Sequence, residues 1–187
     1  MSDEATGSSA SPAAVLRSLV ANAVDAEPAS LDDRIEVVER GAGATDAEDA
    51  APPDERLAEL VGAAESVVAV VPRFDADLAR RLNASLSSSG TVPSDVRVVF
   101  TDAAGDRLAG ATGPVVRRAL SERGVDAYRH DGESPVAVVL ADDRAAVGLT
   151  DGDGISALLW TDAPAVREWA AATCARYLDA AEPVTEG

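Results

Sequence analysis

The chain has 187 residues, of which 47% are hydrophobic, and this is enough for one domain with a buried core. Acidic residues outnumber basic ones by 33 to 16, which gives a net charge of −17. One cysteine excludes an internal disulfide and a cysteine-based zinc site, one histidine excludes a histidine-rich metal centre, and no apolar run reaches the roughly 20 residues of a membrane span.

The first 54 residues predict three segments. Residues 1–10 are acidic and polar, from which we expect a disordered tail and neither a signal peptide nor a transit peptide. Residues 11–40 contain an apolar stripe at helical spacing, followed by the short strand pattern "RIEVVER". Residues 41–54, "GAGATDAEDAAPPD", are typical of an acidic Gly/Ala/Pro linker. The main α/β domain is therefore predicted to cover residues 55–187.

Helix and strand patterns alternate from Glu55 to Tyr128. The continuous apolar run "SVVAVV" predicts a strand buried on both faces, and "DVRVVF" and "VDAYR" predict two more. A helix capped by Asp75 lies between the first two strands, and a helix broken around "GATGP" lies between the last two. This order predicts a parallel β-α-β-α-β core with right-handed crossovers.

After Tyr128 the alternation of helices and strands ends, and three consecutive strands are predicted. "PVAVVLA", "RAAVGLT" and "ISALLWT" are separated only by "DD" and "DGDG", which predicts an antiparallel meander. A final helix follows, and we expect Asp162 to cap it and both Trp160 and Trp169 to pack it onto the meander. The fold class is thus α/β, a parallel core extended by a three-strand antiparallel meander and a C-terminal helix. The two tryptophans could instead mark an interface with a second copy.

All 16 basic residues are arginine, and the chain has no lysine. Together with the excess of Asp and Glu and 3% aromatic residues, this composition resembles proteins of halophilic archaea. Such self-repulsion is screened over about 3 Å at 1 M salt. We therefore expect a soluble protein of a high-salt cytoplasm, with no membrane association. The lack of clustered Lys and Arg argues against direct binding to nucleic acid.

The order of elements resembles one half of a phospholipase D-like domain. It is more similar to the effector-binding C-terminal domains of archaeal transcription regulators of the TrmB type, over roughly Glu55 to Pro183. The residues that carry this likeness are Asp142-Asp143-Arg144, Val147-Gly148, Asp162, Pro164 and Trp169-Ala170. The resemblance implies a role in transcription regulation, a small anionic metabolite as ligand, and action through a homodimer or a DNA-binding partner protein.

Phospholipase D-like enzymes use a histidine nucleophile and a lysine two residues further on. In register with this family those positions fall near Pro135 and Ala137, and a chain without lysine cannot supply the second group. We therefore predict a domain without catalysis, cofactor or metal. The first 54 residues also show no helix-turn-helix spacing. Either the chain is a sensory module that acts through a partner, or the resemblance concerns the fold alone.

Candidate ligand-binding residues follow the parallel strands, because ligands of open α/β sheets lie beyond the carboxyl ends of strands. Two arginines among them could clamp a carboxylate or a phosphate, or could simply pair with the abundant acids. These candidates are Arg73, Asp75, Thr101, Asp102, Arg129 and His130.

Two other functions remain open. A protein-protein interaction module without a small ligand could use a sheet edge or the region of Trp160 and Trp169. A hydrolase would use His130 as base, with Ser134 or Thr101 as nucleophile. "TDGDG", Thr150 to Gly154, lacks the ligand spacing of a calcium loop and predicts a hairpin turn.

Overall fold

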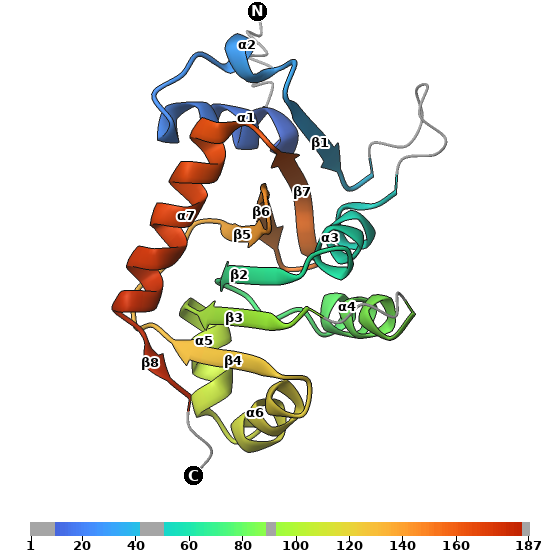
Figure 1. Cartoon of the computed structure of the whole chain (residues 1–187), viewed down its shortest axis with the longest axis vertical. Helices are drawn as coiled ribbons and strands as arrows, with labels where there is room; N and C mark the ends of the chain where they lie inside the picture. Colours follow the sequence, from blue (N-terminus) through green and yellow to red (C-terminus); the bar gives the residue numbers. More distant parts are fainter. Residues whose placement is uncertain (1–9, 42–50, 89–92, 185–187) are drawn as a thin grey trace, which may run out of the picture.

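The computed structural model describes residues 10–41, 51–88 and 93–184 (Figure 1). Most of the expected tail and linker lie outside these residues. The division into domains stays a prediction. The elements are, in chain order, α1 (Pro12–Ala23), α2 (Pro28–Leu31), β1 (Ile35–Glu39), α3 (Pro53–Gly62), β2 (Ser66–Val71), α4 (Ala76–Ser88), β3 (Asp95–Phe100), α5 (Asp102–Ala109), α6 (Gly113–Ser121), β4 (Val125–Arg129), β5 (Ala137–Ala141), β6 (Arg144–Asp151), β7 (Gly154–Thr161), α7 (Pro164–Asp179) and β8 (Glu182–Pro183).

All the strands belong to one mixed sheet, in the order β1-β7-β6-β5-β2-β3-β4-β8. Strands β2, β3 and β4 are parallel, and β5, β6 and β7 form an antiparallel meander that joins β2 through β5. Both features confirm the predicted fold class. Two pairings were not predicted: β1 lies antiparallel to β7, and the short β8 lies antiparallel to β4. The segment that precedes the predicted linker therefore belongs to the same sheet, as its edge strand β1.

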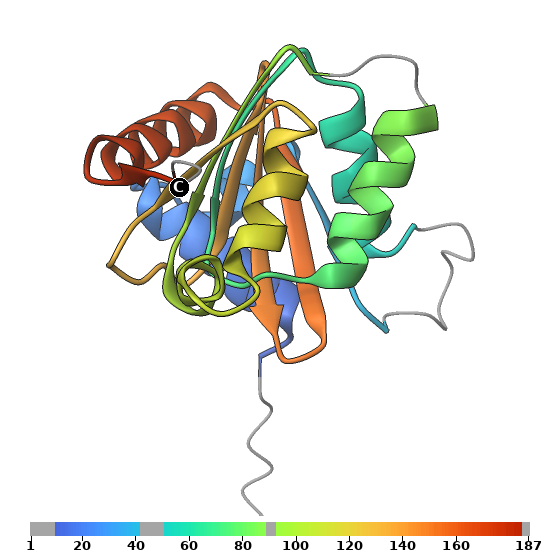
Figure 2. The same ribbon diagram turned by 90° about the horizontal axis from the view of Figure 1, so that it is seen from below.

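Helices cover both faces of the sheet, which makes three layers. Figure 2 shows α1 and α7 on one side and α3, α4, α5 and α6 on the other. Side chains of β7 alternate between them: Ala157 and Leu159 belong to the core beneath α1 and α7, whereas Leu158 and Trp160 belong to the core beneath α3. Among the described helices, none is both long and apolar enough to cross a membrane.

The helix ends confirm one predicted cap and correct another. The Asp75 carboxylate accepts the N–H groups of Asp77 and Leu78, as expected for an N-cap. Asp162 does not cap α7. Instead, the Thr161 hydroxyl accepts the Ala163 N–H at 3.0 Å and donates to the Arg34 carbonyl at 2.6 Å. A buried threonine that ends β7 thus orders the turn and leaves Asp162 exposed.

The tryptophans also differ from expectation, because only Trp169 packs in the core beneath α7. Trp160 lies on the opposite face of the sheet, 8% exposed, with the Arg56 guanidinium 4.8 Å from its ring centroid. The sheet therefore separates the two indole rings, and they share no common surface.

Candidate functional site

A pocket of about 200 Å³ lies at the carboxyl edge of the sheet, beyond the ends of β3 and β4. We call it the carboxyl-edge pocket. One wall is the start of α5, and the other is the loop that leaves β4. The residues that line it are Asp102, Gly105, Asp106, Arg129, His130, Asp131, Gly132 and Glu133.

Asp102 joins the two walls of this pocket. One of its carboxylate oxygens accepts the Ser134 N–H at 2.9 Å and the hydroxyl of Thr101, which is fully buried, at 3.0 Å. Its backbone has φ +48°, in the left-handed region that aspartate tolerates better than most residues. Asp102 therefore fixes the loop after β4 against the first turn of α5.

Side-chain contacts between neighbouring residues hold the loop after β4 together. Arg129 pairs with Asp131, with 2.9 Å between guanidinium nitrogen and carboxylate oxygen, and their side chains are 41% and 85% exposed. His130 Nδ1 accepts the Gly132 N–H at 2.8 Å, so the neutral imidazole carries its proton on Nε2. The imidazole also lies edge-on to the Tyr177 ring, with 4.9 Å between centroids.

Gly105 keeps the α5 wall close to β3 and β4. A Cβ at this position would lie 3.3 Å from the Phe100 carbonyl oxygen and 3.6 Å from Arg129 Cγ. A side chain here would therefore crowd the backbone and fill space beside the arginine.

Arg73 and Asp75 lie outside the lining of the pocket. Asp75 is committed to capping α4, and the exposed Arg73 contributes to the field around Asp151 in the β6–β7 turn. The pKa of Asp151 lies below its usual value, mainly because the Asp153 N–H donates to its carboxylate, and further because Arg40 bonds to it at 3.1 Å. Only one of the two predicted arginines therefore reaches the pocket.

Sequence reasoning missed five lining residues, although two signals pointed to them. Asp131, Gly132 and Glu133 directly follow β4, so the rule that selected Arg129 and His130 also covers them. Gly105 and Asp106 lie three and four positions after Asp102 on α5, which places all three on one helical face.

Neither proposed nucleophile bonds to His130 among the described residues. The Ser134 hydroxyl donates to the Val136 carbonyl at 2.7 Å, and the Thr101 hydroxyl donates to Asp102. A base must lie within hydrogen-bond reach of the hydroxyl that it activates. Cys174 lies on the buried face of α7, and burial raises the pKa of its thiol to about 12. Within the described ranges, no group of three His, Cys, Asp or Glu residues is placed to hold a metal ion.

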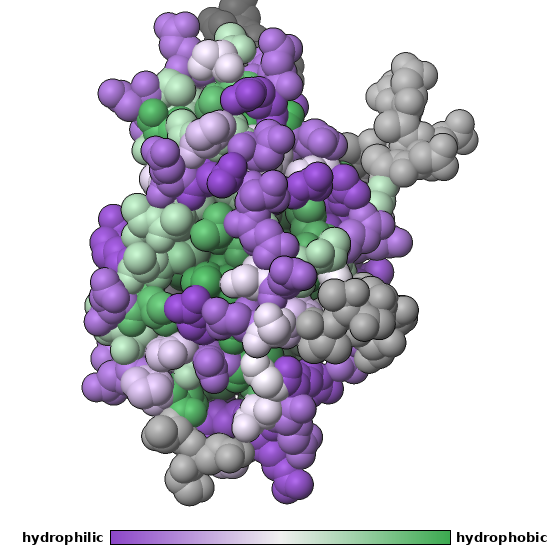
Figure 3. Space-filling model, viewed as in Figure 1, coloured by the Kyte–Doolittle hydropathy of each residue, from purple (hydrophilic) through white to green (hydrophobic). Residues whose placement is uncertain are grey.

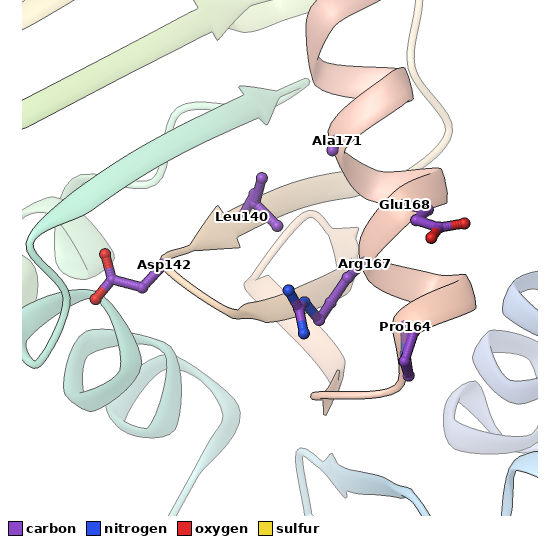
Figure 4. A pocket seen from close by; sticks show the side chains of 6 residues that line it. All are labelled: Leu140, Asp142, Pro164, Arg167, Glu168 and Ala171. Atoms are coloured by element: carbon purple, nitrogen blue, oxygen red, sulfur yellow. The ribbon is translucent and has the colours of Figure 1, made fainter.

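A groove of similar size lies at the opposite, amino edge of the sheet, between β5 and α7 (Figure 4). Arg167 extends toward its centre, whereas the Asp142 carboxylate points toward the start of β2 and Glu168 points outward. Figure 3 shows apolar surface over α7 and the adjoining strands, bordered by hydrophilic side chains. None of the predicted site residues lines this groove, which is formed by Leu140, Asp142, Pro164, Arg167, Glu168 and Ala171.

Comparison with known proteins gives one family match and several similar structures. The family model described as "Methanogenesis regulatory protein FilR1, middle domain" matches residues 51–180. No curated protein matches the sequence. TrmBL2, described as an archaeal chromatin protein with a novel mode of DNA binding, aligns with a TM-score of 0.51 and 13% identity over 90% of this chain. The chain spans 59% of the length of the TrmBL2 chain.

Two members of another group of proteins share the fold. The phospholipase D family member Nuc from Salmonella typhimurium aligns with a TM-score of 0.56 and 13% identity, over 80% of this chain and 96% of its own. NucT from Helicobacter pylori aligns with a TM-score of 0.55 and 14% identity, over 80% and 98%. At these identities the likeness concerns the fold alone, which is the phospholipase D-like fold expected from the sequence.

Proposed function

Because the chain belongs to the family of the FilR1 middle domain, we propose that it is a non-catalytic regulatory domain that acts in transcription regulation. In this proposal a small anionic metabolite binds in the carboxyl-edge pocket and controls a homodimer or a DNA-binding partner protein. The acidic composition supports a high-salt archaeal cytoplasm as the place where it acts.

The observation that carries the ligand proposal is the pairing of Arg129 with Asp131 at the pocket. Asp131 is 85% exposed, and ion pairs this exposed are worth only about 0.2–1 kcal/mol. A ligand carboxylate or phosphate could replace Asp131 on the guanidinium at little cost and bind it with two parallel hydrogen bonds. The pocket volume of about 200 Å³ lies below the roughly 300–1,000 Å³ of drug-sized sites, so it suits a small metabolite.

The absence of catalysis is supported by the residues at the family's reactive positions. Pro135 and Ala137 stand near the places of the phospholipase D-like histidine and lysine, and the chain has no lysine. The hydroxyls of Ser134 and Thr101 are already donated to other acceptors, which favours a binding site over a hydrolase.

A route from the pocket to the rest of the molecule runs through α7. The Tyr177 hydroxyl donates to the Glu133 carbonyl at 2.8 Å, and β8 pairs with the last residues of β4. Helix α7 has 16 residues and so spans about 24 Å, from this loop to the groove at the other edge. A ligand that moves the loop would therefore act on the end of α7.

The interaction-module alternative receives less support. One of its two proposed surfaces, the other being a sheet edge, included both Trp160 and Trp169. Trp160 is nearly buried beneath α3, and Trp169 is half-buried on the opposite face. A shared tryptophan surface would need both rings on one side of the sheet.

Thermal unfolding in about 2 M KCl with sugar phosphates, nucleotides and organic acids tests the proposal. A ligand at 100 times its Kd should raise the Tm by roughly 5–10 °C. Arg129→Ala should abolish this shift, whereas Arg73→Ala, a matched arginine at the same edge outside the pocket, should keep it. Equal ligand response in wild type and Arg129→Ala would refute the site. Light scattering with and without the active compound then measures dimerisation.

A further inference from the structure

The carboxyl-edge pocket carries more negative than positive charge. Four carboxylates line it, those of Asp102, Asp106, Asp131 and Glu133, against the single guanidinium of Arg129. Asp102 is satisfied by two donors, and Asp131 pairs with Arg129. In the described part of the chain, the carboxylates of Asp106 and Glu133 have neither an ionic nor a hydrogen-bonding partner. Of the four carboxylates, two are therefore bound and two are unmatched.

A ligand with only negative charge fits such a pocket poorly. If its anionic group replaced Asp131 on Arg129, it would lie close to the displaced Asp131 and to the unmatched Asp106 and Glu133. Asp106 and Glu133 are exposed, so each repulsion is weak by itself, but a bound anion would add a fifth negative charge beside a single positive one. A ligand that also carries a cationic group would relieve this repulsion, and the two unmatched carboxylates come from different walls, α5 and the loop after β4.

We propose that the ligand of the carboxyl-edge pocket is zwitterionic, a small amino acid or a compound with the same pair of charged groups. Its carboxylate pairs with Arg129, and its ammonium group is neutralised by Asp106 and Glu133. A volume of about 200 Å³ accommodates both groups on a short carbon skeleton. This inference rests on the proposed function, since it keeps the pocket and the pairing of a ligand anion with Arg129, and it adds a cationic group to the purely anionic metabolite proposed above.

Matched sets of three compounds test the charge requirement in thermal unfolding. Each set contains an amino acid, the acid that lacks only its amino group, and the amine that lacks only its carboxylate: alanine, propionate and ethylamine, or leucine, 4-methylpentanoate and 3-methylbutylamine. For at least one set, the amino acid should bind roughly tenfold or more tightly than either partial compound, because only it matches both charges.

Two variants test the binding of the ligand's carboxylate and of its ammonium group separately. Arg129→Ala should abolish binding of the amino acid. The double variant Asp106→Asn with Glu133→Gln should bind the amino acid and its des-amino acid equally well. The matched control, Glu36→Gln with Asp143→Asn, changes two exposed carboxylates outside the pocket and should keep the full preference.

The outcomes distinguish this inference from the function on which it rests. Preference for the amino acid, lost in the double variant and kept in the control, supports both. Equal binding of acid and amino acid to the wild type, still dependent on Arg129, overturns the zwitterion and leaves the sensory function standing. No Tm shift with these sets or with the sugar phosphates, nucleotides and organic acids overturns both.

Discussion

Gly154 is a residue whose identity the structure explains by two separate constraints. It opens β7 after the turn Asp151–Asp153, with φ +110°, a backbone conformation that residues with a side chain rarely adopt. A Cβ at this position would also lie 2.3 Å from Asp75 Oδ2, the carboxylate that caps α4. The glycine thus lets the β6–β7 turn approach the start of α4.

Gly154→Ala should lower the free energy of unfolding by about 1–3 kcal/mol, because it adds backbone strain and displaces the cap of α4. Gly152→Ala in the same turn is the matched control, since its Cβ would meet nothing within 4 Å. It should change stability by less than about 1 kcal/mol. Urea unfolding followed by circular dichroism measures both. Equal effects of the two substitutions would show that the approach to Asp75 is unimportant.

The turn between β5 and β6 shows how a single side chain connects distant elements. Asp142 has φ +49°, and its carboxylate accepts the N–H groups of Glu65 and Ser66 at 2.9–3.2 Å. Its own N–H donates to the Ser66 carbonyl at 3.0 Å. The meander is therefore attached to the start of β2 by this turn as well as by the pairing of β5 with β2.

Asp142→Ala should cost about 1–3 kcal/mol of stability, because two backbone donors lose their acceptor and alanine tolerates the left-handed backbone less well. Asp142→Asn keeps one acceptor oxygen and should recover part of this loss. Asp143→Ala, at the exposed neighbouring position of the same turn, should remain within about 0.5 kcal/mol of wild type. Guanidinium unfolding midpoints compare the three variants. A large effect of Asp143→Ala would contradict the role assigned to Asp142.

The elements that the sequence predicts well are those with a local signal. Continuous apolar runs located β2 and β3, and the tight turns "DD" and "DGDG" located the meander. Strands β1 and β8 have partners far away in the chain, β7 and β4, and no local pattern encodes such pairings. The prediction that Asp162 caps α7 was wrong for a similar reason. Thr161 is fixed by Arg34, which lies 127 residues earlier.

Half of the residues predicted for the candidate site do line the pocket, and they too were found from a local signal. Strand ends identified Asp102, Arg129 and His130, because parallel strands end at one edge. Which strand ends share a pocket depends on strand order and on where each loop turns, so Arg73 was grouped with Arg129 although it lies near Asp151. The partners of each carboxylate, which decide the charge left over in the pocket, also depend on contacts made only in the folded chain.

The net negative charge of the whole molecule opposes folding. With a net charge of −17 over 187 residues, many exposed carboxylates repel one another. The ion pairs of the arginines in the described part of the chain lie at exposed or half-buried positions, where they add little. Small side chains dominate the interior, with alanine and valine at most core positions of the sheet, so each residue buries little apolar area. The stability of this fold should therefore depend on screening by salt.

The Tm should rise by roughly 10 °C or more between about 0.2 M and 2 M KCl, because the Debye length shrinks from about 7 Å to about 2 Å. Sucrose at equal osmolality should reproduce little of this rise if screening is the cause. A variant with amides at five exposed carboxylates that have no ionic partner in the described part of the chain should be more stable at low salt and less dependent on KCl. These positions are Glu36, Asp126, Asp143, Asp162 and Glu168. A Tm of the wild type that is flat across this range would show instead that the acidic surface is tolerated without salt, and the composition would then say nothing about the solvent in which the protein works.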